Sequence, residues 1–211
     1  MLAIVDYGVG NLFSLKSSFA AIGQEAAVVT DPAALKKADR IILPGVGAFA
    51  DAANKLAASG MRETLMEMAA AGTPLLGICL GMQLLFDKSY EYGEHAGLGL
   101  IPGEVRPIAD VIPKGLKIPE IGWNALRFPY GKHAIFRYVK EGDHVYFVHS
   151  YYAVTSPAYL AADTEYGAYL TAAAAKGNVT GCQFHPEKSG EVGLGILRAF
   201  CEWRPEEETV C

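Results

Sequence analysis

Short apolar runs alternate with segments of helical spacing along the first half of the chain. The runs predict strands at residues 2–5, 26–29, 41–43 and 74–78. The intervening segments, whose apolar residues recur every three or four positions, predict helices at 12–22, 51–58, 61–71 and from Leu80 onward. Because the strands are continuously apolar, we expect a parallel sheet that carries helices on both faces.

The second half of the chain has a different pattern. Its short β-type runs, such as 145–148 and 159–162, are separated by Gly and Pro. We expect these runs to add antiparallel strands to an open, mostly parallel central sheet. A last strand at 179–184 and a final helix at 190–203 complete the pattern. No repeat or linker interrupts it, so residues 1–211 are predicted to form a single α/β domain.

Composition narrows the classes of protein. A chain of 211 residues, 51% hydrophobic and 19% charged, is long enough for one sizeable core. Its net charge of −5 lacks the basic footprint of a nucleic-acid binder. No apolar stretch reaches the roughly 18 residues of a membrane helix, and the first residues do not resemble a signal peptide. We therefore expect neither nucleic acid nor membrane as a partner.

The four cysteines, at positions 79, 182, 201 and 211, have spacings that match neither a zinc site nor a disulfide framework. This indicates a cytoplasmic protein with reduced thiols. We expect no metal and no cofactor. The acidic stretch after Trp203 matches no motif, and we assign it no role.

The strongest chemical signal is the string LLGICLGMQLLF at residues 75–86. An apolar strand ends, Cys79 follows, and a helix begins at once, with Gly77 and Gly81 on either side. This is a nucleophile elbow with Cys in place of Ser. The start of a helix favours a thiolate, and the Leu80 N–H is placed to hold an oxyanion. The alternative is a buried structural cysteine in a tight turn.

A base for Cys79 is predicted in the string GCQFHPE. It also ends a strand, and the carboxyl ends of parallel strands meet at one edge of a sheet, so His185 should reach Cys79. Pro186 fixes the direction of the chain, and Glu187 can then orient the imidazole. The alternative is an exposed histidine before a turn. Of the other histidines, His149 ends a β-run but lacks a following carboxylate, so we expect it to line the site.

Two further features suit a substrate pocket. The Gly45-Val46-Gly47 segment of LPGVG ends a strand, and its glycines allow backbone N–H groups to approach a ligand. An ordinary tight turn would explain it equally well. Gln83 lies four residues after Cys79, on the same helix face, where it could bond the polar end of a substrate. The alternative is a surface glutamine.

Together these strings resemble the class I, or triad, glutamine amidotransferases. GICLGMQLLF, LPGVG and the HPE of QFHPEKSG resemble that superfamily. DYGVGNL, GWN, FVHSY and PEKSG resemble one branch, the glutaminase subunits of imidazole glycerol phosphate synthase in histidine biosynthesis. The similarity runs from about Val5 to Phe200.

The resemblance implies a flavodoxin-like fold and a glutaminase that releases ammonia through a cysteine thioester. Cys79 would be the nucleophile, His185 the base and Glu187 its orienting carboxylate. Residues 45–47 would form a mobile oxyanion strand, and Gln83 would contact glutamine. The remaining residues assigned to the substrate and oxyanion region are Leu80, His149, Ser150 and Tyr151.

The resemblance also implies a heterodimer with a (β/α)8-barrel cyclase, a lyase. That partner would receive ammonia through an interior channel and make imidazole glycerol phosphate and an aminoimidazole carboxamide ribotide. Asn11, Trp123 and Lys188 are expected at the interface. Two alternatives remain: the same chemistry serving another synthase (anthranilate, carbamoyl phosphate or guanylate), or an inactive scaffold subunit.

Overall fold

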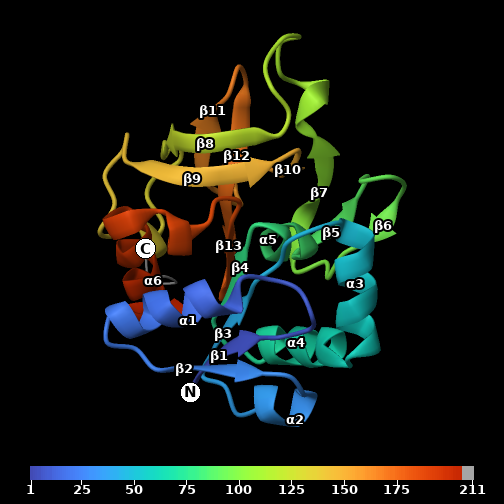
Figure 1. Cartoon of the computed structure of the whole chain (residues 1–211), viewed down its shortest axis with the longest axis vertical. Helices are drawn as coiled ribbons and strands as arrows, with labels where there is room; N and C mark the ends of the chain where they lie inside the picture. The colour runs from blue at the N-terminus through green and yellow to red at the C-terminus, as the bar shows by residue number, and fades with distance from the viewer. Residues whose placement is uncertain (206–211) are drawn as a thin grey trace.

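The computed structural model describes residues 1–205, so the three glutamates of the acidic tail and Cys211 lie outside the described residues. A seven-stranded sheet forms the centre of the molecule, in the order β11-β12-β13-β4-β3-β1-β2 (Figure 1). The parallel strands are β1 (Leu2–Val5), β2 (Ala26–Val29), β3 (Arg40–Leu43), β4 (Leu75–Ile78) and β13 (Val179–Cys182). The predicted mostly parallel sheet is therefore confirmed.

Helices cover both faces of this sheet. One face carries α1 (Leu12–Ala21) and α6 (Gly190–Glu202), and the other carries α2 (Pro32–Leu35), α3 (Phe49–Ala58) and α4 (Met61–Ala70). Successive β1 residues enter different cores: Leu2 packs with the α1 and α6 side, and Ala3 with the α3 and α4 side. A strand buried on both faces must be apolar throughout, which explains its uninterrupted sequence.

The second half adds antiparallel strands, but only some of them join the central sheet. β11 (Leu160–Glu165) and β12 (Tyr169–Lys176) extend it beyond β13, as expected. A separate four-stranded sheet is formed by β5 (Phe86–Ser89), β6 (His95–Ala96), β7 (Ile101–Pro107) and β10 (Tyr151–Val154). β8 (Glu120–Ala125) pairs only with β9 (His144–His149) in a two-stranded sheet. The expected antiparallel extension is therefore confirmed for the run at 159–162, whereas the run at 145–148 lies in β9, outside the central sheet.

Several element boundaries differ from the predictions. The helix α2 was not predicted. Asp31 caps it by accepting a hydrogen bond from the Ala34 N–H at 2.9 Å. β13 stops at Cys182 instead of Phe184, since the chain then turns and the His185 N–H donates to the Tyr146 carbonyl of β9. Short 3-10 helices occur at Ile108–Asp110, Ala134–Phe136 and Pro186–Lys188.

The order of the strands determines where the chemistry lies. β3, β4 and β13 are neighbours, and their register pairs Leu43 with Gly77 and Ile78 with Cys182. The LPGVG loop, the α5 helix (Leu80–Leu84) and the HPE turn therefore leave the sheet at the same edge. Among residues 1–205, no helix has both the length and the apolar content that a membrane crossing requires.

Candidate active site

Cys79 occupies a strained turn between β4 and α5. Its φ of 56° and ψ of −112° place a residue that is not glycine in a backbone region that side chains rarely adopt. The flanking glycines allow the turn. A Cβ at Gly81 would lie 1.9 Å from the Leu43 carbonyl oxygen, and one at Gly77 would lie 2.7 Å from the Gly81 oxygen. The turn thus presents a sulfur at the edge of the sheet only if both positions lack side chains.

His185 and Glu187 form a buried pair next to this cysteine. His185 Nδ1 lies 2.8 Å from Glu187 Oε1, and the two side chains are only 3% and 1% exposed. The Ser189 hydroxyl donates to the His185 carbonyl at 2.6 Å and fixes the turn. Burial by itself lowers the pKa of His185, but hydrogen bonds and opposite charge from Cys79 and Glu187 outweigh it and raise the pKa to about 9. The ring therefore favours the imidazolium at neutral pH.

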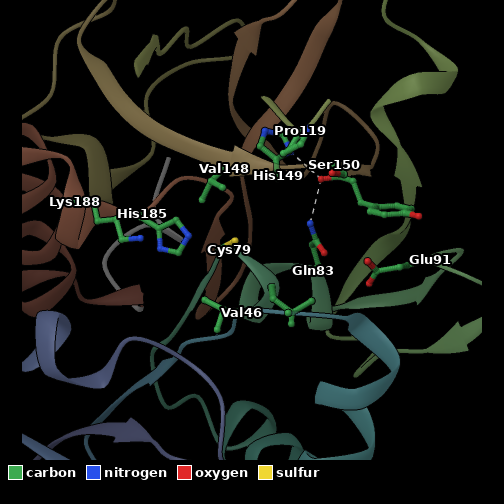
Figure 2. Close-up of a pocket in the computed structure, with 13 residues that line it drawn as sticks. Val46, Cys79, Gln83, Glu91, Pro119, Val148, His149, Ser150, His185 and Lys188 are labelled. Atoms are coloured by element: carbon green, nitrogen blue, oxygen red, sulfur yellow. Dashed lines mark hydrogen bonds between the residues drawn. The ribbon is translucent and has the colours of Figure 1, made fainter. Parts of the chain in front are cut away.

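A pocket of about 370 Å³ opens at the sulfur of Cys79 (Figure 2). Most of the predicted site residues line it: Val46, Gly47, Cys79, Leu80, Gln83, His149, Ser150, Tyr151, His185 and Lys188. Glu91, Pro119 and Val148 complete the wall. The volume suits a small polar molecule.

The LPGVG loop borders this pocket next to α5. A Cβ at Gly45 would lie 2.8 Å from the Gly81 backbone nitrogen, so the loop packs directly against the elbow. Gly47 has a φ of +96° with open space around it, so its role is conformational. Val46 is 43% exposed at the rim. Gly45 itself does not line the pocket but supports the residues that do.

Gln83 is buried, so its interpretation as a surface glutamine is wrong. Its Nε2 donates to the Tyr151 carbonyl at 3.1 Å and to Gln183 Oε1 at 2.9 Å. The Nε2 of Gln183 lies 3.7 Å from Cys79 Sγ. Gln183 was not among the predicted site residues. It directly follows an apolar strand and is fully buried, and a buried amide needs hydrogen-bond partners, which indicates a polar site.

Two carboxylates were also missed. Glu91 lines the pocket, and its Oε2 accepts the Phe49 N–H at 2.5 Å. Glu120 is buried on β8, with Oε2 3.1 Å from His149 Nε2. His149 lines the pocket, and its Nδ1 donates to the Tyr151 carbonyl at 2.8 Å. Its carboxylate partner lies 29 residues earlier in the sequence, on the neighbouring strand, so the residues next to His149 could not reveal it.

The three residues expected at a partner interface are placed differently. Trp123 is 55% exposed on β8 and meets the Tyr146 ring edge to face at 6.1 Å. Lys188 Nζ lies 5.7 Å above that same ring. We call Ile121, Trp123, Tyr146 and Lys188 the β8–β9 patch. Asn11 has a local role: its side chain caps α1 by accepting the Ser14 N–H at 3.4 Å.

The described residues show no grouping of three His, Cys, Asp or Glu side chains that would hold a metal ion. Cys79, Cys182 and Cys201 are free thiols. Burial raises the pKa of Cys182 well above its usual value, so it is a poor competitor for the role of nucleophile.

Comparison with known proteins shows the family of the chain. The family described as "Glutamine amidotransferase class-I" matches residues 3–202. An "Imidazole glycerol phosphate synthase subunit HisH" of Wolinella succinogenes is 47% identical over 96% of this chain and 99% of its own. The protein of the same name from Lactococcus lactis is 48% identical over 95% of this chain and 98% of its own.

Solved structures show the same fold at lower identity. A crystal structure of a glutamine amidotransferase superposes with a TM-score of 0.74 at 21% identity, covering 95% of this chain and 97% of the other. A chain of the PurLQS structure from Thermotoga maritima gives 0.73 at 19% identity, with the same coverage of 95% and 97%.

Proposed function

This chain belongs to the class I glutamine amidotransferase family and acts as the glutaminase subunit of imidazole glycerol phosphate synthase, and we propose that Cys79, His185 and Glu187 hydrolyse its glutamine. The observation that carries this assignment of residues is the buried His185–Glu187 pair, 2.8 Å apart, beside a cysteine in a strained elbow.

Hydrolysis begins with attack of the Cys79 thiolate on the side-chain carboxamide carbon of glutamine. The His185 imidazolium stabilises the thiolate by its charge and then gives a proton to the departing nitrogen, so that ammonia leaves. The neutral ring takes a proton from water, and the resulting hydroxide attacks the thioester carbon. The sulfur leaves as thiolate, and glutamate is released. Glu187 holds Nδ1–H and stabilises the imidazolium in both steps.

Two backbone segments are placed to stabilise the oxyanion. The Leu80 N–H follows the nucleophile at the start of α5, and the 45–47 loop packs against that helix. Loss of one oxyanion donor costs roughly 3 kcal/mol, enough to silence such an enzyme. A small displacement of the exposed Val46 segment would therefore switch the activity. We expect low glutaminase activity in the isolated subunit and activation by its partner.

The pocket supplies groups for the amino-acid end of glutamine. The Glu91 carboxylate attracts its ammonium group, and the amide oxygen of Gln83 adds an acceptor. Both donor hydrogens of Gln83 are used within the protein, so this oxygen is the atom left for a ligand. Ser150 lies toward the same end of the pocket as Glu91 (Figure 2), and Tyr151 also lines the pocket.

The ammonia passes to the cyclase subunit of the synthase, which we propose to be a (β/α)8 barrel, a lyase, in a cytoplasmic heterodimer. The β8–β9 patch suits its docking, because the exposed Trp123 indole contacts the Tyr146 ring, and Lys188, above that ring, lines the pocket that holds Cys79. Asn11 caps α1, and its place at the interface stays a prediction.

Labelling separates a glutaminase from an inactive scaffold. A glutamine-analogue electrophile should modify Cys79 alone, and free glutamine should protect it, as peptide mapping would measure. Cys201, which is partly exposed, is the internal control and should stay unmodified. Modification elsewhere, or no protection by glutamine, would contradict the assignment.

A further inference from the structure

Among residues 1–205, the most deeply buried pair of a carboxylate and a basic side chain outside the triad is Glu120 with His149, and the mechanism does not use it. The side chains of Glu120 and His149 are 4% and 2% exposed, and Oε2 lies 3.1 Å from Nε2. Burying a carboxylate and an imidazole is costly unless both are fully hydrogen-bonded. A pair kept beside a substrate pocket at such a cost indicates a role in that pocket.

The bonding pattern fixes where the protons lie. The Tyr151 carbonyl can only accept, so the Nδ1 of His149 carries a hydrogen. One further proton must lie between Nε2 and Glu120, on the ring or on the carboxyl group. In either case the bond is made, and removal of Glu120 leaves Nε2 buried without its partner.

The Glu120–His149 pair is linked to the substrate pocket through the carbonyl oxygen of Tyr151. The Tyr151 oxygen accepts from both His149 Nδ1 and Gln83 Nε2, and Figure 2 shows the two dashed lines meeting there. Gln83 in turn bonds Gln183, whose Nε2 lies near the sulfur of Cys79. The position of the Gln83 side chain in the pocket thus depends on where His149 holds the Tyr151 carbonyl.

The other end of the pair lies on β8. Oε1 of Glu120 accepts from the Asn124 amide at 3.0 Å, and that amide also donates to the Glu165 carbonyl at 2.8 Å. Side chains alternate along a strand, so Ile121 and Trp123 point outward, 62% and 55% exposed. The strand that holds Glu120 inward therefore presents two residues of the β8–β9 patch, Ile121 and Trp123, outward.

We propose that Glu120 is a positioning residue for glutamine, which acts through His149 to fix the Tyr151 carbonyl and Gln83. The proposal deepens the function proposed above and rests on it. Since β8 carries Glu120 as well as Ile121 and Trp123, a partner that docks on the β8–β9 patch contacts the strand that holds this bond.

Kinetics of the complex with the cyclase subunit test the proposal. Glu120→Ala should raise the KM for glutamine about tenfold, the size of one lost hydrogen bond, with kcat changed much less. Glu120→Gln should restore KM, because its amide can donate to a neutral Nε2 and its oxygen can accept from Asn124. Glu120→Asp is one methylene too short and should give an intermediate KM. If the Ala variant does not fold, the Asp and Gln variants decide.

Asp163→Ala is the matched control, since Asp163 is a buried carboxylate, 6% exposed, paired with Arg127 at 3.6 Å and outside the pocket. It should lose stability without a change in KM. An equal rise in KM in this control would mean general loosening and would overturn the proposal, as would an unchanged KM in Glu120→Ala.

Labelling of the complex with the cyclase subunit gives a second, independent readout. Glu120→Ala should slow modification of Cys79 by a glutamine-analogue electrophile but leave the rate with iodoacetamide unchanged. Equal effects on both reagents would overturn the positioning role. Failure of the unaltered protein to react with the glutamine analogue would instead contradict the proposed function itself.

Discussion

His185 Nδ1 lies 2.8 Å from Glu187 Oε1, and this pair is buried beside the sulfur of Cys79. The second carboxylate oxygen of Glu187 is buried with no hydrogen-bond partner among residues 1–205. The imidazole is thus the group that compensates the charge of this carboxylate. A buried charge with one partner makes that partner's protonation sensitive to any change at position 187.

The pH dependence follows from this pair. Burial lowers the pKa of His185, but Cys79 and Glu187 raise it to about 9 from an ordinary 6.5. The imidazolium that protonates ammonia is therefore present at neutral pH and lost as the pH rises through about 9. We expect kcat/KM for glutamine to fall on the alkaline side with an apparent pKa near that value, which belongs to the coupled groups together. A flat profile to higher pH would contradict this.

The same shift contributes to stability with a definite sign. The folded pKa of about 9 lies above the unfolded value of 6.5, so the contribution is fully present below pH 6.5. It is lost as the pH rises through the folded value. Urea unfolding should be measured from pH 6.5 to above pH 9 for the unaltered chain and for Cys79→Ala. The free energy of unfolding should fall less in the variant, because Cys79 is one cause of the raised pKa.

Glu187→Gln keeps the shape of the side chain and removes its charge. The amide would face Nδ1 with a donor or a weaker acceptor, so the imidazolium loses its support. We expect kcat to fall roughly 10²–10⁴-fold, as at the equivalent position of other triads. The alkaline limb should also move to lower pH. Glu191→Gln, on the exposed first turn of α6, is the control and should leave the rate unchanged.

Glu91→Gln tests the recognition of the glutamine ammonium group. Loss of a charge-assisted hydrogen bond costs about 1.5–3 kcal/mol, which corresponds to a KM raised roughly 10–100-fold. Steady-state kinetics of the complex measure it. Glu94→Gln removes an exposed carboxylate paired with Lys88 and should have no effect on KM. Equal KM values in the two variants would place the ammonium group elsewhere.

Gly81→Ala tests the steric argument for the elbow. Its Cβ would lie 1.9 Å from the Leu43 oxygen, which is backbone and cannot move aside. We expect a loss of about 3 kcal/mol or more in the free energy of unfolding. Gly72→Ala is the control: its φ is +89° with nothing within 4 Å, so only backbone strain of about 1 kcal/mol applies. Equal losses in the two variants would show that strain alone limits both positions.

The sequence predicted those features that short segments determine. The strands at 26–29 and 74–78 are continuous apolar runs, and the structure confirms β2 and, within one residue, β4. The glycines around Cys79 indicated a tight turn because each has a local steric reason. The parallel edge of the sheet then implied that His185 and Cys79 approach each other.

Contacts between distant segments could not be predicted in the same way. Glu120 and His149 belong to two strands that residues 126–143 separate in the sequence, and neither residue is marked by its neighbours. The same holds for Glu91, which reaches the pocket from the loop after β5. β8 and β9 form a sheet of their own instead of joining the central sheet. The alternation of apolar and polar residues in a strand does not specify which sheet the strand joins.

The most direct test of the account compares two nitrogen sources in the complete synthase with Cys79→Ala. We predict that glutamine-dependent synthesis falls to background, because no nucleophile remains to release ammonia. Synthesis supplied with ammonium salts should continue at the rate of the unaltered complex, which shows that the cyclase subunit is folded and active. Continued hydrolysis of glutamine by Cys79→Ala would contradict the assignment of the nucleophile.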